Sequence, residues 1–252
     1  MEPLPTLRED WQRALCVVAH PDDLEYGTAA AVARWTAQGK HVAYLLVTRG
    51  EAGIDGLDPA EAGPLREAEQ RQAGREVGVD ELEFLDYRDG IIEYGLPLRR
   101  DIARVIRRQR PDLVITGSYE DKIGAFLNQA DHRAVGLATL DAVRDAANRW
   151  VFPELVAEGH APWPGVRAIL FAGSSQANCG VDVGEHLEQG RAALRAHQGY
   201  FSGLGDGSTD PAEIVDYIAS EAGKRMAVES AAIFEACPMD PTAPPPWDPD
   251  PR

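Results

Sequence analysis

The chain has 252 residues, 44% of them hydrophobic, and 41 acidic side chains against 25 basic ones give it a formal charge of −16. This length and apolar content suffice for one large α/β core. The negative charge disfavours nucleic acid and anionic membrane surfaces as partners. The first 13 residues are polar and no later apolar run reaches membrane-spanning length, so neither a signal peptide nor a membrane span is predicted. Cys16, Cys179 and Cys237 form no Cys-x-x-Cys pair, which indicates a reducing compartment, and we expect a cytoplasmic protein.

Apolar runs typical of strands alternate with helical patterns along most of the chain. The predicted strands are residues 14–18, 41–48, 81–86, 112–116 and 166–172. The predicted helices are residues 24–38, 65–77, 98–109, 131–150, 183–197 and 213–234, and residues 49–64 are predicted to be a loop. This alternation predicts an α/β, Rossmann-like fold whose mainly parallel sheet carries helices on both faces. Residues 1–237 are expected to form a single domain, and the Pro-rich residues 238–252 a tail that is disordered or draped on the surface.

The segment Ala-His-Pro-Asp-Asp at residues 19–23 follows the first predicted strand. Open α/β sheets place their ligands at the carboxyl ends of strands. His20 and Asp23 offer donors that suit a divalent metal such as zinc, and Asp22 lies between them, close enough to hold a metal-bound water. The alternative is that Asp22 or Asp23 caps the following helix. Two adjacent carboxylates beside a histidine exceed what a cap requires.

A third ligand is expected because catalytic zinc sites usually have three protein ligands plus water. His132 follows the fourth predicted strand and a long loop, and it begins a helix on the same edge of the sheet as His20. The alternative for His132 is a helix-start residue beside Asp131 as N-cap.

Further motifs follow the first one in a defined order. They are residues 48–53 (Thr-Arg-Gly-Glu-Ala-Gly), 66–69 (Arg-Glu-Ala-Glu), 84–86 (Phe-Leu-Asp) with 89–90 (Asp-Gly), 110–114 (Arg-Pro-Asp-Leu-Val) and 131–132 (Asp-His). With the intact first motif, the sequence resembles the PIG-L/LmbE-like family of metal-dependent N-deacetylases over roughly residues 15–197. The resemblance implies that His20, Asp23 and His132 bind Zn²⁺, with Asp22 as the general base. Fe²⁺ would tolerate the same ligands.

The resemblance also implies roles for residues around the metal. Asp131 would hydrogen-bond a ligand histidine and fix its tautomer, and Arg66 and Asp89 would contact a sugar substrate. The family's His-x-Asp-His is Gln129-Ala130-Asp131-His132 here. A Gln129 amide can donate to a developing oxyanion but cannot carry a proton.

A late histidine, His197, lies in a segment that resembles one supplying a histidine in the family. It would protonate the leaving amine or, alternatively, cap the carboxyl end of a helix. Many relatives have a basic residue upstream, where this chain has Gly190.

The implied reaction is zinc-dependent hydrolysis of an N-acyl group, expected to be N-acetyl, from a small-molecule amino sugar or its conjugate, with Asp22 activating the water. One alternative is an amidase that acts on a larger thiol-sugar conjugate. Another, motivated by Gln129, is a non-catalytic, metal-containing, sugar-binding relative. A nucleotide-binding Rossmann protein is disfavoured because no Gly-x-Gly-x-x-Gly follows the first strand.

Overall fold

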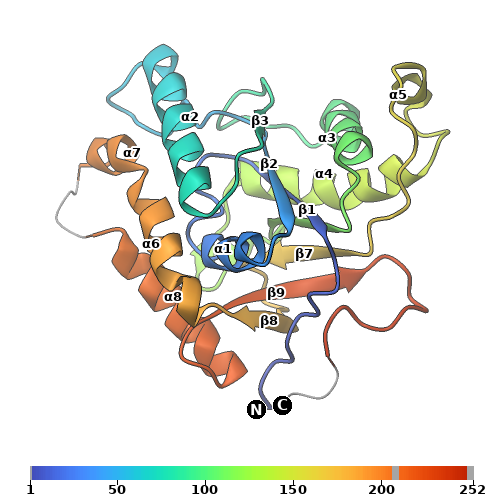
Figure 1. The fold of residues 1–252 in the computed structure, drawn as a ribbon. Helices are drawn as coiled ribbons and strands as arrows, with labels where there is room; N and C mark the ends of the chain where they lie inside the picture. The colour runs from blue at the N-terminus through green and yellow to red at the C-terminus, as the bar shows by residue number, and fades with distance from the viewer. Residues whose placement is uncertain (1, 206–209, 249–252) are drawn as a thin grey trace.

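The computed structural model describes residues 2–205 and 210–248, and its centre is a seven-stranded sheet of order β3-β2-β1-β4-β7-β9-β8 (Figure 1). The strands are β1 (Arg13–Val18), β2 (His41–Leu46), β3 (Leu82–Phe84), β4 (Leu113–Gly117), β7 (Ala168–Ala172), β8 (Cys179–Asp182) and β9 (Ala231–Pro238). The first five in sheet order pair in parallel, whereas β9 runs antiparallel to both β7 and β8. A small hairpin of β5 (Lys122–Ile123) and β6 (Phe126–Leu127) lies outside this sheet.

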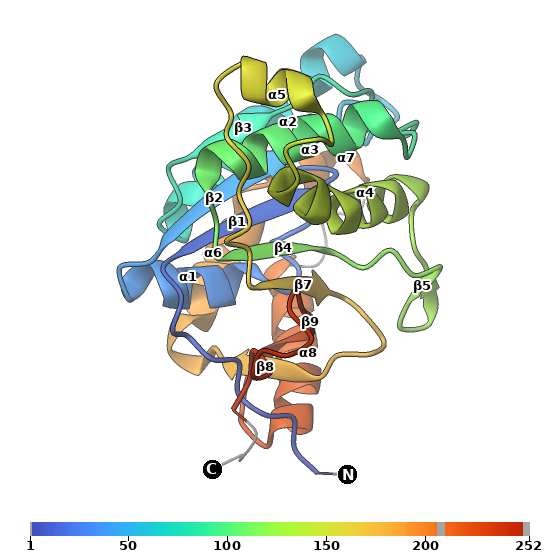
Figure 2. The same cartoon turned by 90° about the vertical axis from the view of Figure 1, so that its right-hand side faces the viewer.

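Helices cover both faces of the sheet, with α3 and α4 on one side and α1 and α6 on the other (Figure 2). The helices are α1 (Ala29–Ala37), α2 (Pro59–Glu76), α3 (Leu96–Gln109), α4 (Ala130–Ala147), α5 (Pro153–Ala157), the 3₁₀ turn η1 (Gly184–His186), α6 (Leu187–Arg195), α7 (Gln198–Gly203) and α8 (Ala212–Met226). The predicted fold class is confirmed. None of the described helices has the length and apolar character needed to cross a membrane.

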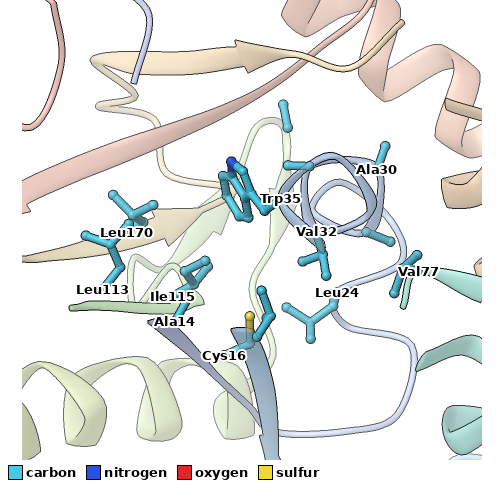
Figure 3. Packing of buried hydrophobic residues seen from close by; sticks show 14 of the residues in the cluster. Ala14, Cys16, Leu24, Ala30, Val32, Trp35, Val77, Leu113, Ile115 and Leu170 are labelled. Atoms are coloured by element: carbon cyan, nitrogen blue, oxygen red, sulfur yellow. The ribbon is translucent and has the colours of Figure 1, made fainter. Parts of the chain in front are cut away.

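Side chains of β1 alternate between two hydrophobic cores, one on each face of the sheet. Cys16 belongs to the core that packs under α1, and its neighbour Leu15 belongs to the core under α3 and α4. Figure 3 shows Trp35 of α1 packed among strand side chains that include Ile115, and Trp35 is completely buried. Because both faces are covered, β1 is apolar at successive positions rather than at alternate ones.

The prediction of one helix over residues 213–234 is wrong at its carboxyl end. Helix α8 ends at Met226, and Ala227 adopts a left-handed φ of 56°. The chain then enters β9, which pairs with β7 and with β8, a strand that the sequence did not predict. A short apolar run such as residues 231–237 fits either a helix or a buried strand, so pairing with β7 decides the structure of this one.

The predicted loop over residues 49–64 is wrong from residue 59 onward, where α2 begins. The Asp58 side chain accepts a hydrogen bond from the Ala60 N–H at 2.9 Å, and Pro59 occupies the first turn. An aspartate N-cap followed by proline is a common helix start. Pro64, the last residue of the predicted loop, lies inside this helix.

The segment after β9 lies against the amino-terminal segment. Trp247 bridges to Leu7, and the Asp248 N–H donates to the Thr6 carbonyl at 2.9 Å. Strand β9 extends one residue beyond the predicted boundary at residue 237. The division into a domain and a tail stays a prediction, and the last four residues of that tail lie outside the described residues.

Candidate metal centre and active site

The cluster of predicted ligands lies where the chain direction across the sheet reverses. Strands β1 and β4 are neighbours, but the chain leaves β1 toward β2 and leaves β4 toward β7. Such a switch point opens a crevice at the carboxyl ends of the two strands. His20 comes two residues after β1, and His132 lies in the first turn of α4, which follows β4. The fold therefore brings together residues that are 112 positions apart.

Three donor atoms face one another in this crevice. His20 Nδ1 lies 3.3 Å from His132 Nε2, His132 Nε2 lies 3.1 Å from Asp23 Oδ1, and His20 Nδ1 lies 3.7 Å from Asp23 Oδ1. Ligands held tetrahedrally at zinc distances are separated from one another by roughly 3.3 Å. The three observed separations bracket that value, so the donor set fits a divalent metal ion.

Hydrogen bonds orient two of these donors from behind. Asp23 Oδ2 accepts the backbone N–H groups of Ala19 and His20 at 3.0 and 2.9 Å, which leaves Oδ1 facing the site. His132 Nδ1 lies 3.1 Å from Asn128 Oδ1. Donation to that amide oxygen leaves Nε2 with the free lone pair that a metal needs.

His20 is oriented by two carboxylates on its far side. Its Nε2 lies 2.9 Å from Asp89 Oδ1 and 3.3 Å from Asp131 Oδ2. Asp131 is itself held by the backbone N–H groups of Gly90 and Ile92 at 2.7 and 3.1 Å. An Nε2–H that donates to these carboxylates leaves Nδ1 free toward His132, the arrangement expected of a metal ligand.

The site is built to attract positive charge. Burial opposes a charge on His20, but the carboxylates of Asp23, Asp131 and Asp89 outweigh it and raise the pKa of His20 to about 12. Burial also opposes ionisation of Asp23, yet the adjacent His132 and His20 hold its pKa well below the usual range. A divalent cation would satisfy the same carboxylates.

Asp22 lines the same crevice, and its two carboxylate oxygens differ in their partners. Arg66 Nη2 donates to Asp22 Oδ1 at 3.2 Å, whereas Oδ2 has no hydrogen-bond partner among the described residues. Burial raises the pKa of Asp22 to about 8, although the neighbouring Arg66 charge opposes this. A carboxylate with one oxygen held and the other free is suited to taking a proton from a nearby water.

Arg66 and Asp89, the two predicted substrate contacts, also make contacts within the protein. Arg66 donates to the carbonyl oxygens of Gly50 and Pro21 at 2.9 and 2.8 Å, and its guanidinium lies 4.0 Å from the centre of the Tyr200 ring. Asp89 uses Oδ1 on His20, and its Oδ2 accepts the Ala52 N–H at 2.8 Å. Both side chains nevertheless line the cavity described below.

Gln129 and His197 differ in their access to the cavity. Gln129 is exposed, lines the cavity and precedes the first residue of α4. His197 has 0% exposure and does not line the cavity, and neither of its ring nitrogens has a hydrogen-bond partner among the described residues. Its Nε2 lies 3.9 Å from Glu25 Oε2. The helix-capping alternative has no support in these contacts.

Gly190, which replaces the basic residue of many relatives, allows two helices to approach closely. A Cβ at Gly190 would lie 3.0 Å from the Cβ of Ala30 in α1, closer than side chains normally pack. The position therefore serves the contact between α6 and α1 rather than the site.

A cavity of about 1170 Å³ contains the cluster at one end and runs along one face of α8 at the other. This volume exceeds the usual range of small-ligand pockets, roughly 300–1,000 Å³. At the cluster, the cavity is lined by His20, Asp22, Asp23, Arg66, Asp89, Gln129 and His132. Among the predicted site residues, Asp131 and His197 lie behind this lining.

The family profile described as "PIG-L: GlcNAc-PI de-N-acetylase" matches residues 15–143, more than half of the chain. The chain belongs to the PIG-L family. This confirms the family expected from residues 19–23 and the motifs that follow. The matched range contains the three candidate metal ligands and also Asp22 and Gln129.

Two relatives agree with this membership, and one solved structure shares the fold. The chain is 31% identical over 198 residues to diacetylchitobiose deacetylase of Thermococcus kodakarensis, covering 76% of this chain and 71% of that protein. It is 32% identical over 175 residues to the 1D-myo-inositol 2-acetamido-2-deoxy-alpha-D-glucopyranoside deacetylase of Streptomyces griseus, covering 58% and 54%. The fold matches N,N'-diacetylchitobiose deacetylase from Pyrococcus horikoshii with a TM-score of 0.83 and 23% identity, over 93% of this chain and 88% of that one.

Two polar residues of this PIG-L site escaped the sequence analysis. Asn128 lies four residues before His132, in the loop that precedes α4, so its short separation from the proposed ligand was visible in the sequence. Gln70 lies four residues after Arg66 in α2 and is buried, but its contact with Asp22 joins residues 48 positions apart. No local pattern reports such a contact.

Proposed function

We propose that this PIG-L family member is a zinc-dependent N-deacetylase that hydrolyses the N-acyl group, in the first instance N-acetyl, of an amino sugar or amino-sugar conjugate. One observation carries the proposal. The three mutually facing donors of His20, Asp23 and His132 share a cavity with Asp22, whose Oδ2 has no hydrogen-bond partner among the described residues. This is the combination that metal-assisted amide hydrolysis requires, a metal site with a base beside it.

His20, Asp23 and His132 would hold the metal. A bound Zn²⁺ lowers the pKa of its water to about 7 and polarises an amide carbonyl. Two imidazoles and one carboxylate suit zinc, and iron(II) would tolerate the same set.

The chain's own residues supply the proton transfers. Asp22 Oδ2 accepts the proton of the attacking water, while Arg66 holds Oδ1 in place. The protonated carboxyl then returns the proton to the departing amine. We assign this second step to Asp22 rather than to His197, because His197 is fully buried and outside the cavity lining.

Gln129 would stabilise the charge that develops on the carbonyl oxygen. It lines the cavity and lies three residues before His132. Its side-chain amide can donate a hydrogen bond to an oxyanion. Arg66 and Asp89 line the same end of the cavity and would contact the sugar hydroxyl groups.

The size of the cavity favours a conjugate over a free monosaccharide. Tyr217, Ile218, Glu221, Ala222 and Arg225 line it along one face of α8. From the first to the last of these residues, the helix is about 12 Å long. A free N-acetyl amino sugar at the metal end would leave this stretch empty, whereas a second sugar or an aglycone would occupy it.

Acetate release from N,N'-diacetylchitobiose by the zinc-loaded protein tests the reaction. Asp22→Asn should keep one metal per chain and lose activity by about 10²–10⁴-fold, as expected for a general base. The matched control is Asp86→Asn, because Asp86 is an exposed carboxylate paired with Arg49. Loss of the metal in Asp22→Asn would show that Asp22 is a ligand and that its assignment as the base is wrong.

The non-catalytic alternative is tested at Gln129. Gln129→Ala should reduce kcat by about 10²-fold if the amide stabilises an oxyanion. A wild-type protein that binds metal and sugar but releases no acetate from any N-acetylated sugar would establish the non-catalytic reading.

Substrate size and acyl size are separated by two series of compounds. We expect N,N'-diacetylchitobiose to exceed N-acetylglucosamine in kcat/KM, and Tyr217→Ala to reduce that advantage. Higher rates on longer acyl chains than on acetyl would favour the amidase alternative.

We further propose that the protein acts in the cytoplasm, which its three free cysteines support.

A further inference from the structure

Asp22 adopts a backbone conformation that a non-glycine residue does not favour. Its φ is 79°, in the left-handed region. A residue without glycine's freedom keeps this conformation only when its surroundings impose it. The contacts that impose it therefore also determine where the Asp22 carboxylate points.

Two side chains of α2 hold this turn. Arg66 donates to the Pro21 carbonyl at 2.8 Å and to Asp22 Oδ1 at 3.2 Å. Gln70, one helical turn later, accepts the Asp22 backbone N–H on Oε1 at 2.8 Å. Residues four apart lie on the same helix face, so the two side chains reach the turn together.

Both ends of the Gln70 amide are used. Its Nε2 donates to Glu25 Oε1 at 2.8 Å, while Oε1 receives the Asp22 N–H. If the Gln70 amide were flipped, its NH₂ group would face the Asp22 backbone N–H, donor against donor. The two hydrogen bonds therefore fix the orientation of the Gln70 amide. Gln70 and Glu25 are each 1% exposed, and neither lines the cavity. Gln70 is thus out of reach of a substrate.

We propose that Gln70 is a positioning residue for the base. Its carbonyl oxygen fixes the left-handed backbone of Asp22, and its amide group ties that turn to the buried Glu25. Asp22 Oδ1 is then held by Arg66, and Oδ2 has no hydrogen-bond partner among the described residues. The inference rests on the proposed function, because it assigns Asp22 the part of the base.

Gln70→Met tests the inference, since methionine keeps the length of the side chain and removes both hydrogen bonds. We expect kcat to fall by about 10-fold or more, because small misplacements of a reacting group are costly, with KM and metal content within about two-fold of wild type. The matched control is Gln72→Met on the same helix, where the Gln72 amide donates to Glu76. Equal activities of the two variants would overturn the inference.

A double-mutant cycle separates positioning from a general structural role. If Gln70 acts through Asp22, Gln70→Met should cause no further loss in the Asp22→Asn background. An equal fold-loss in both backgrounds would show that Gln70 does not act through the base. Should Gln70→Met fail to fold, Gln70→Asn replaces it, because the shorter amide remains polar but withdraws from the Asp22 N–H.

Hydrogen exchange gives a readout that does not depend on turnover. The Asp22 amide should exchange faster in Gln70→Met than in wild type and Gln72→Met. Unchanged exchange would overturn the inference even in an active enzyme. A wild-type protein inactive on every N-acetylated sugar, yet with accelerated exchange in Gln70→Met, would refute the proposed function while the contact itself stands.

Discussion

Asn128 Oδ1 lies 3.1 Å from Nδ1 of His132, on the side of the imidazole opposite the metal-binding donors. The Asn128 amide is in turn fixed, because its Nδ2 donates to the carbonyl oxygens of Ser118 and Glu120 at 2.7 and 2.9 Å. The loop that follows β4 thus orients the imidazole of His132, the proposed metal ligand in the first turn of α4.

Asn128→Ala should weaken metal binding by about 10–100-fold, because His132 loses the partner that fixes its ring and tautomer. A chelator competition titration measures the change. Asn148→Ala, at the other end of α4, serves as the control. Equal metal affinity in the two variants would mean that the Asn128 contact does not support the ligand.

Gly136 allows α4 to lie close to the end of β4. A Cβ at this position would come within 2.6 Å of the Gly117 carbonyl oxygen. Alanine normally favours a helix over glycine, yet Gly136→Ala should destabilise the protein by about 1–3 kcal/mol through this overlap. It should also weaken metal binding, since His132 lies one turn earlier in α4.

Urea unfolding and the chelator titration check the Gly136 prediction. Gly56→Ala is the control, because a Cβ there meets open space. A Gly136→Ala protein as stable as wild type would show that the helix shifts without cost.

Arg107 stabilises the end of α4 from α3. It is 1% exposed, and its guanidinium donates to the carbonyl oxygens of Asp145, Ala146, Asn148 and Val151 at 2.8–3.1 Å. Arg107→Met would remove these charge-assisted hydrogen bonds, whereas Asp145, Ala146 and Asn148 would each keep a backbone N–H partner. We therefore expect a loss of about 1.5–3 kcal/mol in the free energy of unfolding.

The neighbouring Arg108→Met is the control for Arg107. Arg108 is exposed and paired with Glu83, so its loss should change the free energy of unfolding by less than about 1 kcal/mol. Urea denaturation of both variants measures the difference. Comparable losses would contradict the capping of α4 by Arg107.

His197 should make the metal-free protein sensitive to acid. Burial, with a contribution from the nearby Arg66 charge, lowers the pKa of His197 to about 3. Because the unfolded chain binds this proton at about pH 6.5 and the folded protein does not, stability falls as the pH drops from there toward 3. At pH 5, His197 should lower the free energy of unfolding by about 2 kcal/mol relative to its value at neutral pH.

Chelator-treated wild type and His197→Asn, unfolded in urea at pH 7 and pH 5, test this expectation. The variant should lose less stability than wild type between the two pH values, since it cannot bind the proton. Parallel losses in the two proteins would show that His197 is already protonated when folded, or that its site opens readily.

The sequence by itself determined how parallel strands and helices alternate along the chain. Strands that are buried on both faces need continuous apolar runs, and residues 14–18 and 41–48 are such runs. The candidate metal-binding turn was equally visible in the sequence, because His20, Asp22 and Asp23 lie within four residues at the end of a strand. His132 followed because helices after neighbouring parallel strands begin at the same sheet edge.

Only the tertiary structure decided which segments pair and which polar groups meet across the fold. Residues 231–236 are compatible with either helix or strand, and β9 forms because β7 and β8 offer backbone partners on both sides. The contact of Gln70 with Asp22 and the complete burial of His197 are likewise products of packing between distant segments. Local patterns report the propensity of a segment and the face it buries, whereas the partner of a buried polar atom depends on every element packed around it.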